Sequence, residues 1–252
     1  GEYQPGWMLL SYGKKVSVSS SLEGYPAENI VDEDARTAWV AQSNRDMEWA
    51  QVDLQRLSSI HAIQVNFDEY GANQKGAVSG VYQSYLIYAS VNGEDWSLVV
   101  DYGTKKTDTP HDYIEFEEPF KARYIKLQNK EYMVSENFSV RDLRIFGKGQ
   151  GSTPRAVNDF TVERDEADPC KARLCWEAVP DAQGYIVRYG IAGDKLYNNF
   201  QVMGENTLEI GSLNKGVAYY FTIDAYNENG ITRTSRRRDG LRSYPEVQPV
   251  RH

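Results

Sequence analysis

The stretch Ile60-His61-Ala62-Ile63-Gln64-Val65-Asn66-Phe67 alternates apolar and polar side chains over most of its length. Alternate residues of a β-strand point to opposite faces, so this pattern indicates a strand with one buried face. Shorter stretches of the same kind follow at residues 85–91, 124–127 and 143–146. The chain is also rich in rings that favour strands, with 18 Tyr, 8 Phe and 5 Trp. The sequence therefore predicts an all-β fold.

Turn residues separate these strands. In residues 91–95, Val-Asn-Gly-Glu-Asp, the Asn-Gly pair supplies the positive φ values of a tight hairpin turn. We expect the strands on either side to pair antiparallel. A second break, residues 147–154, reads Gly-Lys-Gly-Gln-Gly-Ser-Thr-Pro and has linker composition. Since 252 residues favour two domains over one, the domain boundary is placed there.

Charge and composition exclude several classes of protein. Residues 1–150 hold 15 basic and 22 acidic side chains, a formal charge of −7 out of −8 for the whole chain. Nucleic-acid affinity depends on Lys and Arg, so no nucleic-acid partner is expected. No apolar run approaches the ~20 residues of a membrane helix, so no membrane insertion is expected. Cys170 and Cys175 would lie about 16 Å apart on an extended strand, too far for a disulfide, and free thiols are expected.

The segment after the linker carries a cleaner alternation. Arg188, Thr222 and Asp224 fall on one face of the expected strands, and an apolar set falls on the other. The apolar set is Leu174, Trp176, Tyr185, Val187, Tyr189, Leu208, Ile210, Phe221, Ile223 and Ala225. Two sheets that bury this set against each other would form a small β-sandwich.

Residues 154–245 resemble a fibronectin type III domain. Residues 174–180 (Leu-Cys-Trp-Glu-Ala-Val-Pro) are similar to that family's strand B with its core Trp, and residues 184–189 are similar to strand C. Leu213 lies six residues before Tyr219 with Gly in the turn, which is similar to the tyrosine corner of the family. The resemblance implies a second β-sandwich.

Residues 12–147 resemble the discoidin-like, or galactose-binding-like, jelly-roll sandwich of family 32 carbohydrate-binding modules and coagulation-factor C domains. The stretches that carry the resemblance are residues 27–32 (Ala-Glu-Asn-Ile-Val-Asp), 36–39 (Arg-Thr-Ala-Trp), 49–54 (Trp-Ala-Gln-Val-Asp-Leu), 60–67, 122–127 and 143–147. The expected organisation is a segment 1–11 from a missing upstream domain, a discoidin-like domain 12–149, a fibronectin type III domain 150–245 and a tail 246–252.

The tandem resembles the C-terminal half of secreted Bacteroidetes glycoside hydrolases, commonly of family 43. Residues 110–113, 190–197 and 223–230 carry this likeness, and the chain begins with Gly rather than Met, as a fragment would. The resemblance implies export to the periplasm, the outer membrane or the exterior, and a plant-type polysaccharide as partner. It also implies an upstream catalytic domain in the same polypeptide and no catalysis by this chain itself.

A calcium site is the most concrete chemical hypothesis. Residues 27–37 offer backbone carbonyls, as at Ala27, the carboxylates of Asp32 and Asp34 and the hydroxyl of Thr37, all hard oxygen ligands. In the sugar-binding modules that this segment resembles, a cation in this loop is completed by a Glu near the last strand, where Asp142 stands here. The alternative is that Asp32 and Asp34 cap turns by accepting backbone N–H groups.

A sugar site needs a ring that stacks on the sugar face and polar groups that reach its hydroxyls. The loop candidates are Gln42, Asn44, Arg45, Tyr70, Asn73, Gln74, Tyr82, Tyr132 and Asn137. Trp39 and Trp49 are assigned to the core instead. The main alternative is that both domains only brace the missing enzyme and bind no sugar. A third hypothesis, phospholipid adhesion, needs exposed apolar spikes beside basic residues, which a domain of charge −7 disfavours.

Overall fold

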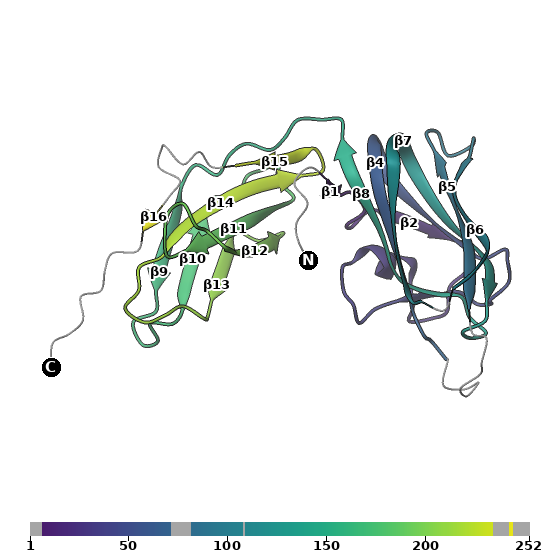
Figure 1. Ribbon diagram of the computed structural model, residues 1–252, viewed down its shortest axis with the longest axis horizontal. Coiled ribbons are helices and arrows are strands. Elements are labelled where there is room, and N and C mark those ends of the chain that lie inside the picture. Colours follow the sequence, from purple (N-terminus) through teal and green to yellow (C-terminus); the bar gives the residue numbers. More distant parts are fainter. Residues whose placement is uncertain (1–6, 72–81, 108, 234–241, 244–252) are drawn as a thin grey trace. The chain divides into compact units, whose positions relative to one another are not determined.

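A computed structural model of the chain describes residues 7–71, 82–107, 109–233 and 242–243, with the backbone alone at 106–107 and 242–243. The chain divides into two compact units, Gly1–Gln150 and Gly151–His252 (Figure 1). Strands dominate both units, and one short 3-10 helix, η1 (Ala27–Val31), is the helical element of the described part. The predicted all-β class is confirmed. No helix in the described ranges has the length and apolarity to cross a membrane.

The first unit is built on one continuous network of antiparallel strands. Its order is β1-β8-β4-β7-β5-β6, with β2 added beside β4 and β3 beside β8. The strands are β1 (Met8–Leu9), β2 (Lys15–Val18), β3 (Trp39–Val40), β4 (Trp49–Phe67), β5 (Gln83–Ser90), β6 (Ser97–Thr107), β7 (His111–Tyr132) and β8 (Ser139–Gly149). Strands β5 and β6 pair antiparallel across the Asn92-Gly93 turn, as predicted.

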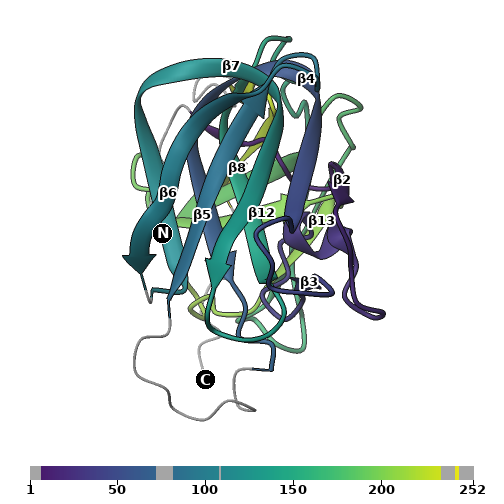
Figure 2. The same cartoon turned by 90° about the vertical axis from the view of Figure 1, so that its right-hand side faces the viewer.

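Two long strands, β4 and β7, each take part in both halves of this network. Residues 49–53 of β4 pair with β2 and with the end of β7, whereas residues 58–67 pair with β8 and with the start of β7. The register shifts between Asp53 and Ser58. Gln55 lies in this shift at φ 66°, in the left-handed region, and its N–H donates to Asp53 Oδ1 at 2.7 Å. Figure 2 shows the strands of this unit with β5 and β6 at the front.

Alternation along these strands builds the core of the first unit. In β4 the buried side chains include Ala50, Val52 and Leu54 before the shift, and Ile63 and Val65 after it. Trp39 is fully buried against Phe138, and its indole N–H donates to Ser20 O at 2.9 Å. Trp49, assigned to the core from sequence, is instead half-buried.

The second unit has two sheets. Strands β9 (Phe160–Arg164), β10 (Ala172–Trp176) and β13 (Thr207–Ile210) form a three-stranded sheet in the order β13-β10-β9. The other sheet has the order β12-β11-β14-β15, with β16 beside β14. Its strands are β11 (Gly184–Gly190), β12 (Asn198–Met203), β14 (Tyr220–Asn227), β15 (Gly230–Thr232) and β16 (Arg242–Ser243).

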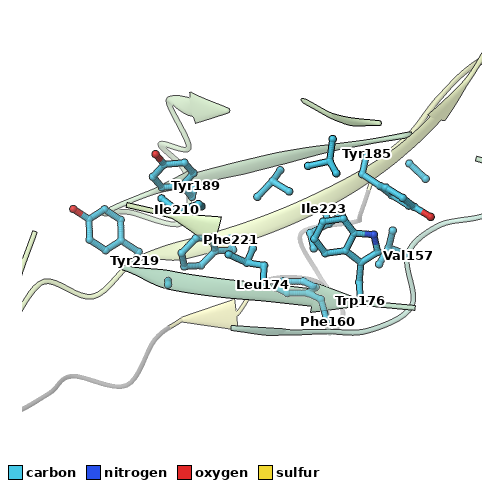
Figure 3. Close-up of a cluster of buried hydrophobic side chains, with 14 of the residues drawn as sticks. Val157, Phe160, Leu174, Trp176, Tyr185, Tyr189, Ile210, Tyr219, Phe221 and Ile223 are labelled. Atoms are coloured by element: carbon cyan, nitrogen blue, oxygen red, sulfur yellow. The ribbon is translucent and has the colours of Figure 1, made fainter. Parts of the chain in front are cut away.

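One apolar cluster, with contributions from both sheets, forms the core of the second unit (Figure 3). Every residue of the predicted inward set is buried except Leu208, which is partly buried. Trp176 is 5% exposed, and its indole N–H has no hydrogen-bond partner among the residues that the structure describes. Tyr219 is also buried, and its hydroxyl accepts a hydrogen bond from the Asn214 N–H at 2.9 Å, the geometry expected of a tyrosine corner.

Polar side chains on the strand face opposite this core are also buried. Thr222 and Asp224 point away from the apolar cluster, as the alternation predicts, but each is only 2% exposed. Asp224 Oδ2 lies 3.0 Å from Arg188 Nε. Burying a carboxylate is costly unless a cation compensates it, and Arg188 compensates the buried charge of Asp224.

The stretch with linker composition is partly structured. Gly147, Lys148 and Gly149 belong to β8 and pair with β4. The Gly151 N–H donates to Asn229 Oδ1 at 2.8 Å, within the second unit. Cys170 and Cys175 are free thiols, as expected.

Gly147 allows β8 to lie close to β4. A Cβ at this position would lie 1.9 Å from Ser59 O, a backbone atom that cannot rotate away. We therefore expect Gly147→Ala to lower the free energy of unfolding of the first unit by about 3 kcal/mol or more, since overpacking of this kind costs ~1–3 kcal/mol even where side chains can adjust. Urea unfolding, monitored by circular dichroism, measures this change in the free energy of unfolding.

Gly211→Ala is the control, because a Cβ there meets nothing within 4 Å. Its stability should stay within about 0.5 kcal/mol of the parent. Equal stability of the Gly147 and Gly211 variants would contradict the packing described here.

Candidate functional site

Several loops of the first unit meet at one end of its strands. The register places Phe67 beside Val140, and Gln83 beside Tyr132, so the loops after β4 and β7 leave the network at the same end. The loop after β3 joins them, because the Ala41 N–H donates to Phe138 O at 2.8 Å. We call this region the loop end and define it as the described residues 19–25, 41–48, 68–71, 82 and 133–138.

Two of the candidate amides at the loop end are used to hold the loops together. Asn44 Nδ2 donates to Tyr132 O at 3.2 Å and to Ser135 O at 3.1 Å. Asn137 Nδ2 donates to Ala41 O at 2.8 Å. Because these side chains satisfy backbone carbonyls of neighbouring loops, they position the loop end and do not offer their N–H groups to a ligand.

Tyr132, a candidate from sequence, lies in the core. It is 1% exposed and packs against Phe67 and Phe138, with ring centroids 6.2 and 5.4 Å away. Its hydroxyl donates to Asp68 O, and burial raises the pKa of its phenol. A ring enclosed in this way has no face for a sugar, so the sequence interpretation of Tyr132 as a ligand contact was wrong.

Other candidates remain accessible. Gln42 and Arg45 are exposed, although Gln42 Nε2 donates to Ser21 O at 3.3 Å, and Arg45 forms no ion pair with the described residues. Tyr70 is half-buried and packs edge-on against Tyr25, with ring centroids 5.0 Å apart. Tyr82 is also half-buried.

Sequence analysis left three residues of the loop end unmentioned. Tyr25 lies between Gly24 and Pro26, turn residues that could have placed this ring in a loop, and Gly24 adopts a φ of 86°. Met47 and Met133 project into solvent with exposed fractions of 70% and 48%, which no sequence pattern indicates. Asn73 and Gln74 lie outside the described residues.

The carboxylates of the proposed calcium loop accept local hydrogen bonds. Asp32 Oδ1 accepts from the Asp34 N–H at 2.9 Å, and Asp32 Oδ2 lies 2.6 Å from Thr37 Oγ1. Asp34 accepts from the Arg36 backbone N–H and pairs with the Arg36 guanidinium through both of its oxygens, at 3.0 and 3.1 Å. Hydrogen bonds from Arg36 hold the pKa of Asp34 below its usual value. These local contacts are the ones that the turn-capping alternative describes, and the calcium hypothesis stays a prediction.

Asp142 has a different environment. It is 8% exposed, and within the described residues its carboxylate has no ion-pair partner and accepts one hydrogen bond, from Asn66 Nδ2 at 3.0 Å. Burial raises its pKa, and the charge of Asp32 adds to the shift. Glu33, the residue after Asp32, adopts φ 58° and pairs with Arg144 at 3.0 Å.

The oxygens of Asp32, Asp142 and Thr37 are of the hard type that Ca²⁺ takes as ligands, and the charge of Asp32 raises the pKa of Asp142. Asp34 does not fit, since Arg36 already neutralises it. No group of three or more His, Cys, Asp or Glu side chains is close enough to hold a metal among the residues with described positions.

A comparison with known families assigns the first unit. The model of the F5/8 type C domain matches residues 15–142, which is about half of the chain. The chain belongs to the F5/8 type C domain family. This match confirms the discoidin-like jelly roll predicted for the first unit. The fibronectin type III assignment of the second unit stays a prediction.

Among curated proteins, the F5/8 type C domain is similar to lactadherin. Rat lactadherin is 33% identical over 110 residues, which cover 41% of this chain and 25% of the relative. Mouse lactadherin is 32% identical over 110 residues, covering 41% of this chain and 23% of the relative. The chain thus spans about a quarter of the length of these relatives.

Solved structures with a similar fold include two sugar-binding modules. Chitosan-binding module 1 of a Paenibacillus chitosanase/glucanase is 20% identical with a TM-score of 0.47, and the match covers 56% of this chain and 99% of that one. A family 32 module of Clostridium perfringens, solved with galactose, is 18% identical with a TM-score of 0.45, and the match covers 56% and 98%.

The amide of Asn44 gives a test of the loop-end geometry. Asn44→Ala removes the donor to two partly buried carbonyls of the F5/8 type C domain, so we expect the free energy of unfolding to fall by about 1–3 kcal/mol. Arg45→Ala, one residue away and exposed, should change it by less than about 0.5 kcal/mol. Thermal unfolding compares the two variants, and equal stabilities would contradict a structural role for Asn44.

Proposed function

We propose that this chain is a non-catalytic carbohydrate-binding module pair, and that the F5/8 type C domain binds a glycan at its loop end. The observation that supports this proposal is the Tyr25–Tyr70 ring pair on the same end as the exposed side chains of Gln42 and Arg45. An aromatic pair offers a face for the C–H groups of a sugar, a guanidinium donates to its hydroxyls, and an amide oxygen accepts from them.

The proposal extends to the parent protein. We infer an exported glycoside hydrolase, of the family 43 type found in Bacteroidetes, whose catalytic domain lies upstream in the same polypeptide and acts on a plant-type polysaccharide. In this arrangement the second unit is a fibronectin type III spacer. Its two sheets, its buried Trp176 and the hydrogen bond of Tyr219 at the corner support that assignment.

A structural brace is the second candidate function. Met47 and Met133 expose flexible apolar side chains at the loop end, and such side chains suit a protein surface better than a sugar. If the loop end packs on the catalytic domain, these two methionines are its apolar contacts and no glycan binds there.

Glycan binding separates the two functions. In affinity electrophoresis against arabinan, xylan and galactan, we expect at least one polysaccharide to retard the chain. Tyr70→Ala and Arg45→Ala should each weaken that interaction about tenfold, because a stacked ring or a charge-assisted hydrogen bond contributes roughly 1.5 kcal/mol.

Tyr197→Ala is the matched control, since Tyr197 is a ring of the second unit that is 80% exposed. It should leave the retardation unchanged. Absence of retardation by all three polysaccharides would favour the brace.

We also propose that the F5/8 type C domain holds a structural calcium ion through Asp32, Asp142 and Thr37. The buried carboxylate of Asp142 supports this, because a cation would offset both its desolvation and its repulsion from Asp32. The ion would fix the loop that contains η1 against β8.

Calcium should raise the melting temperature of EDTA-treated protein by about 5 °C or more at saturating concentration. In the Asp142→Asn variant, calcium should no longer raise the melting temperature. Because the pKa of Asp142 is raised in the folded state, its ionised form destabilises the fold at neutral pH, so the metal-free variant should melt above the metal-free parent.

Asp34→Asn serves as the comparison, because Asp34 is paired with Arg36 and is not a proposed ligand. It should retain the calcium increment. An unchanged melting temperature of the parent protein on calcium addition would remove the proposal.

A further inference from the structure

A lysine on the outer face of the first unit is surrounded by aromatic rings. Lys126 of β7 places its Nζ 4.3 Å from the ring centroid of Trp96, 5.7 Å from that of Tyr88 and 5.9 Å from that of Trp49. The three rings come from different parts of the chain: β4, β5 and the turn before β6. Tyr124 adds a fourth ring, 6.4 Å from Trp96. We call these four rings and Lys126 the aromatic platform.

The platform lies on the outward face of the strands. Lys126 pairs in register with Gln51 of β4 and with Tyr88 of β5, whereas its neighbours Ile125 and Leu127 point into the core. Lys126 and the four rings are all partly exposed. A ligand therefore has access to the rings and to the ammonium from solvent.

The ammonium has no anionic partner within the described residues. No carboxylate of a residue with a described side chain lies within ion-pair distance of Lys126, and burial lowers its pKa. The rings stabilise the cation through their π-faces. A partly desolvated cation of this kind attracts an anion more strongly than a fully hydrated one does, because the effective dielectric constant is lower there.

Polar groups flank the platform. Gln51 lies beside Lys126 across the β4–β7 pair, and Gln128 lies two residues along β7, opposite Trp49, with its Nε2 donating to Asp46 O at 3.2 Å. Amides next to aromatic rings supply donors and acceptors for sugar hydroxyls. The platform thus combines stacking surface, hydroxyl recognition and one localised positive charge.

We propose that the aromatic platform is a second saccharide-binding surface, which takes a pyranose that carries a carboxylate, a uronic acid. The sugar ring stacks on Trp96 and Tyr88, and its carboxylate pairs with Lys126. A neutral sugar would leave the ammonium without a counter-charge. The charge of −7 on residues 1–150 does not prevent this, because charges on the rest of the surface are screened beyond about 8 Å at physiological salt.

This inference goes beyond the function proposed for the loop end, since it concerns a different surface and an acidic ligand. The probes are trigalacturonic acid and a neutral galactotriose, titrated calorimetrically into the full chain. We expect trigalacturonic acid to bind, and to bind more weakly as NaCl is raised. Lys126→Met and Trp96→Ala should each weaken it at least tenfold, whereas Lys126→Arg should retain most of the affinity.

Lys130→Met is the control, because Lys130 is an exposed lysine on the same strand and its removal changes the net charge equally. It should change the affinity less than twofold. The proposal is overturned if trigalacturonic acid does not bind, if Lys126→Met binds it as the parent does, or if Lys130→Met loses as much affinity. It is also overturned if galactotriose binds the platform equally well, or if sedimentation shows a dimer that Lys126→Met dissociates.

The two proposals can fail separately. If Arg45→Ala weakens polysaccharide retardation while trigalacturonic acid does not bind, the loop-end function stands and the platform inference fails. If Lys126→Met abolishes trigalacturonic acid binding while no neutral polysaccharide retards the chain, the reverse holds.

Discussion

The register shift in β4 is the constraint on which the first unit depends. Successive side chains of a strand face opposite sides, so a slip of one residue would turn the apolar set of β4 outward. The chain absorbs the shift between Asp53 and Ser58, with Gln55 in the left-handed region. Asp53 holds this conformation by accepting the Gln55 N–H and by pairing with Arg123 through both of its oxygens. The bend lets one strand supply inward side chains to both halves of the unit.

Much of this architecture could be predicted because it depends on local patterns. The alternation at residues 60–67 and the Asn-Gly turn act over a few residues, and both were read correctly. The continuity of β4 and β7 could not be predicted, since Ser58-Ser59 and Glu117-Glu118-Pro119 interrupt the apolar pattern without ending the strands. The burial of Asp224 was also missed, because it depends on a partner 36 residues away in the chain.

The candidate site was harder to predict for the same reason. The sequence does not show whether an Asn or a Tyr in a loop faces a ligand or bonds to the protein's own backbone. Asn44 and Tyr132 turned out to hold loops and core together, through partners far apart in sequence. The aromatic platform gave no local signal either, because its members are brought together only by the pairing of β4, β5 and β7.

Each unit contains a buried tryptophan that can report on it by fluorescence. Trp39 is enclosed in the first unit, where its indole donates a hydrogen bond, and Trp176 is enclosed in the second, where its indole has no acceptor in the described part of the chain. Trp49 and Trp96 instead lie beside a charge at the surface. Indole emission depends on polarity and on neighbouring charge, so the two cores and the surface rings differ in emission wavelength. Unfolding of either unit should therefore change the intrinsic tryptophan fluorescence of the unlabelled chain.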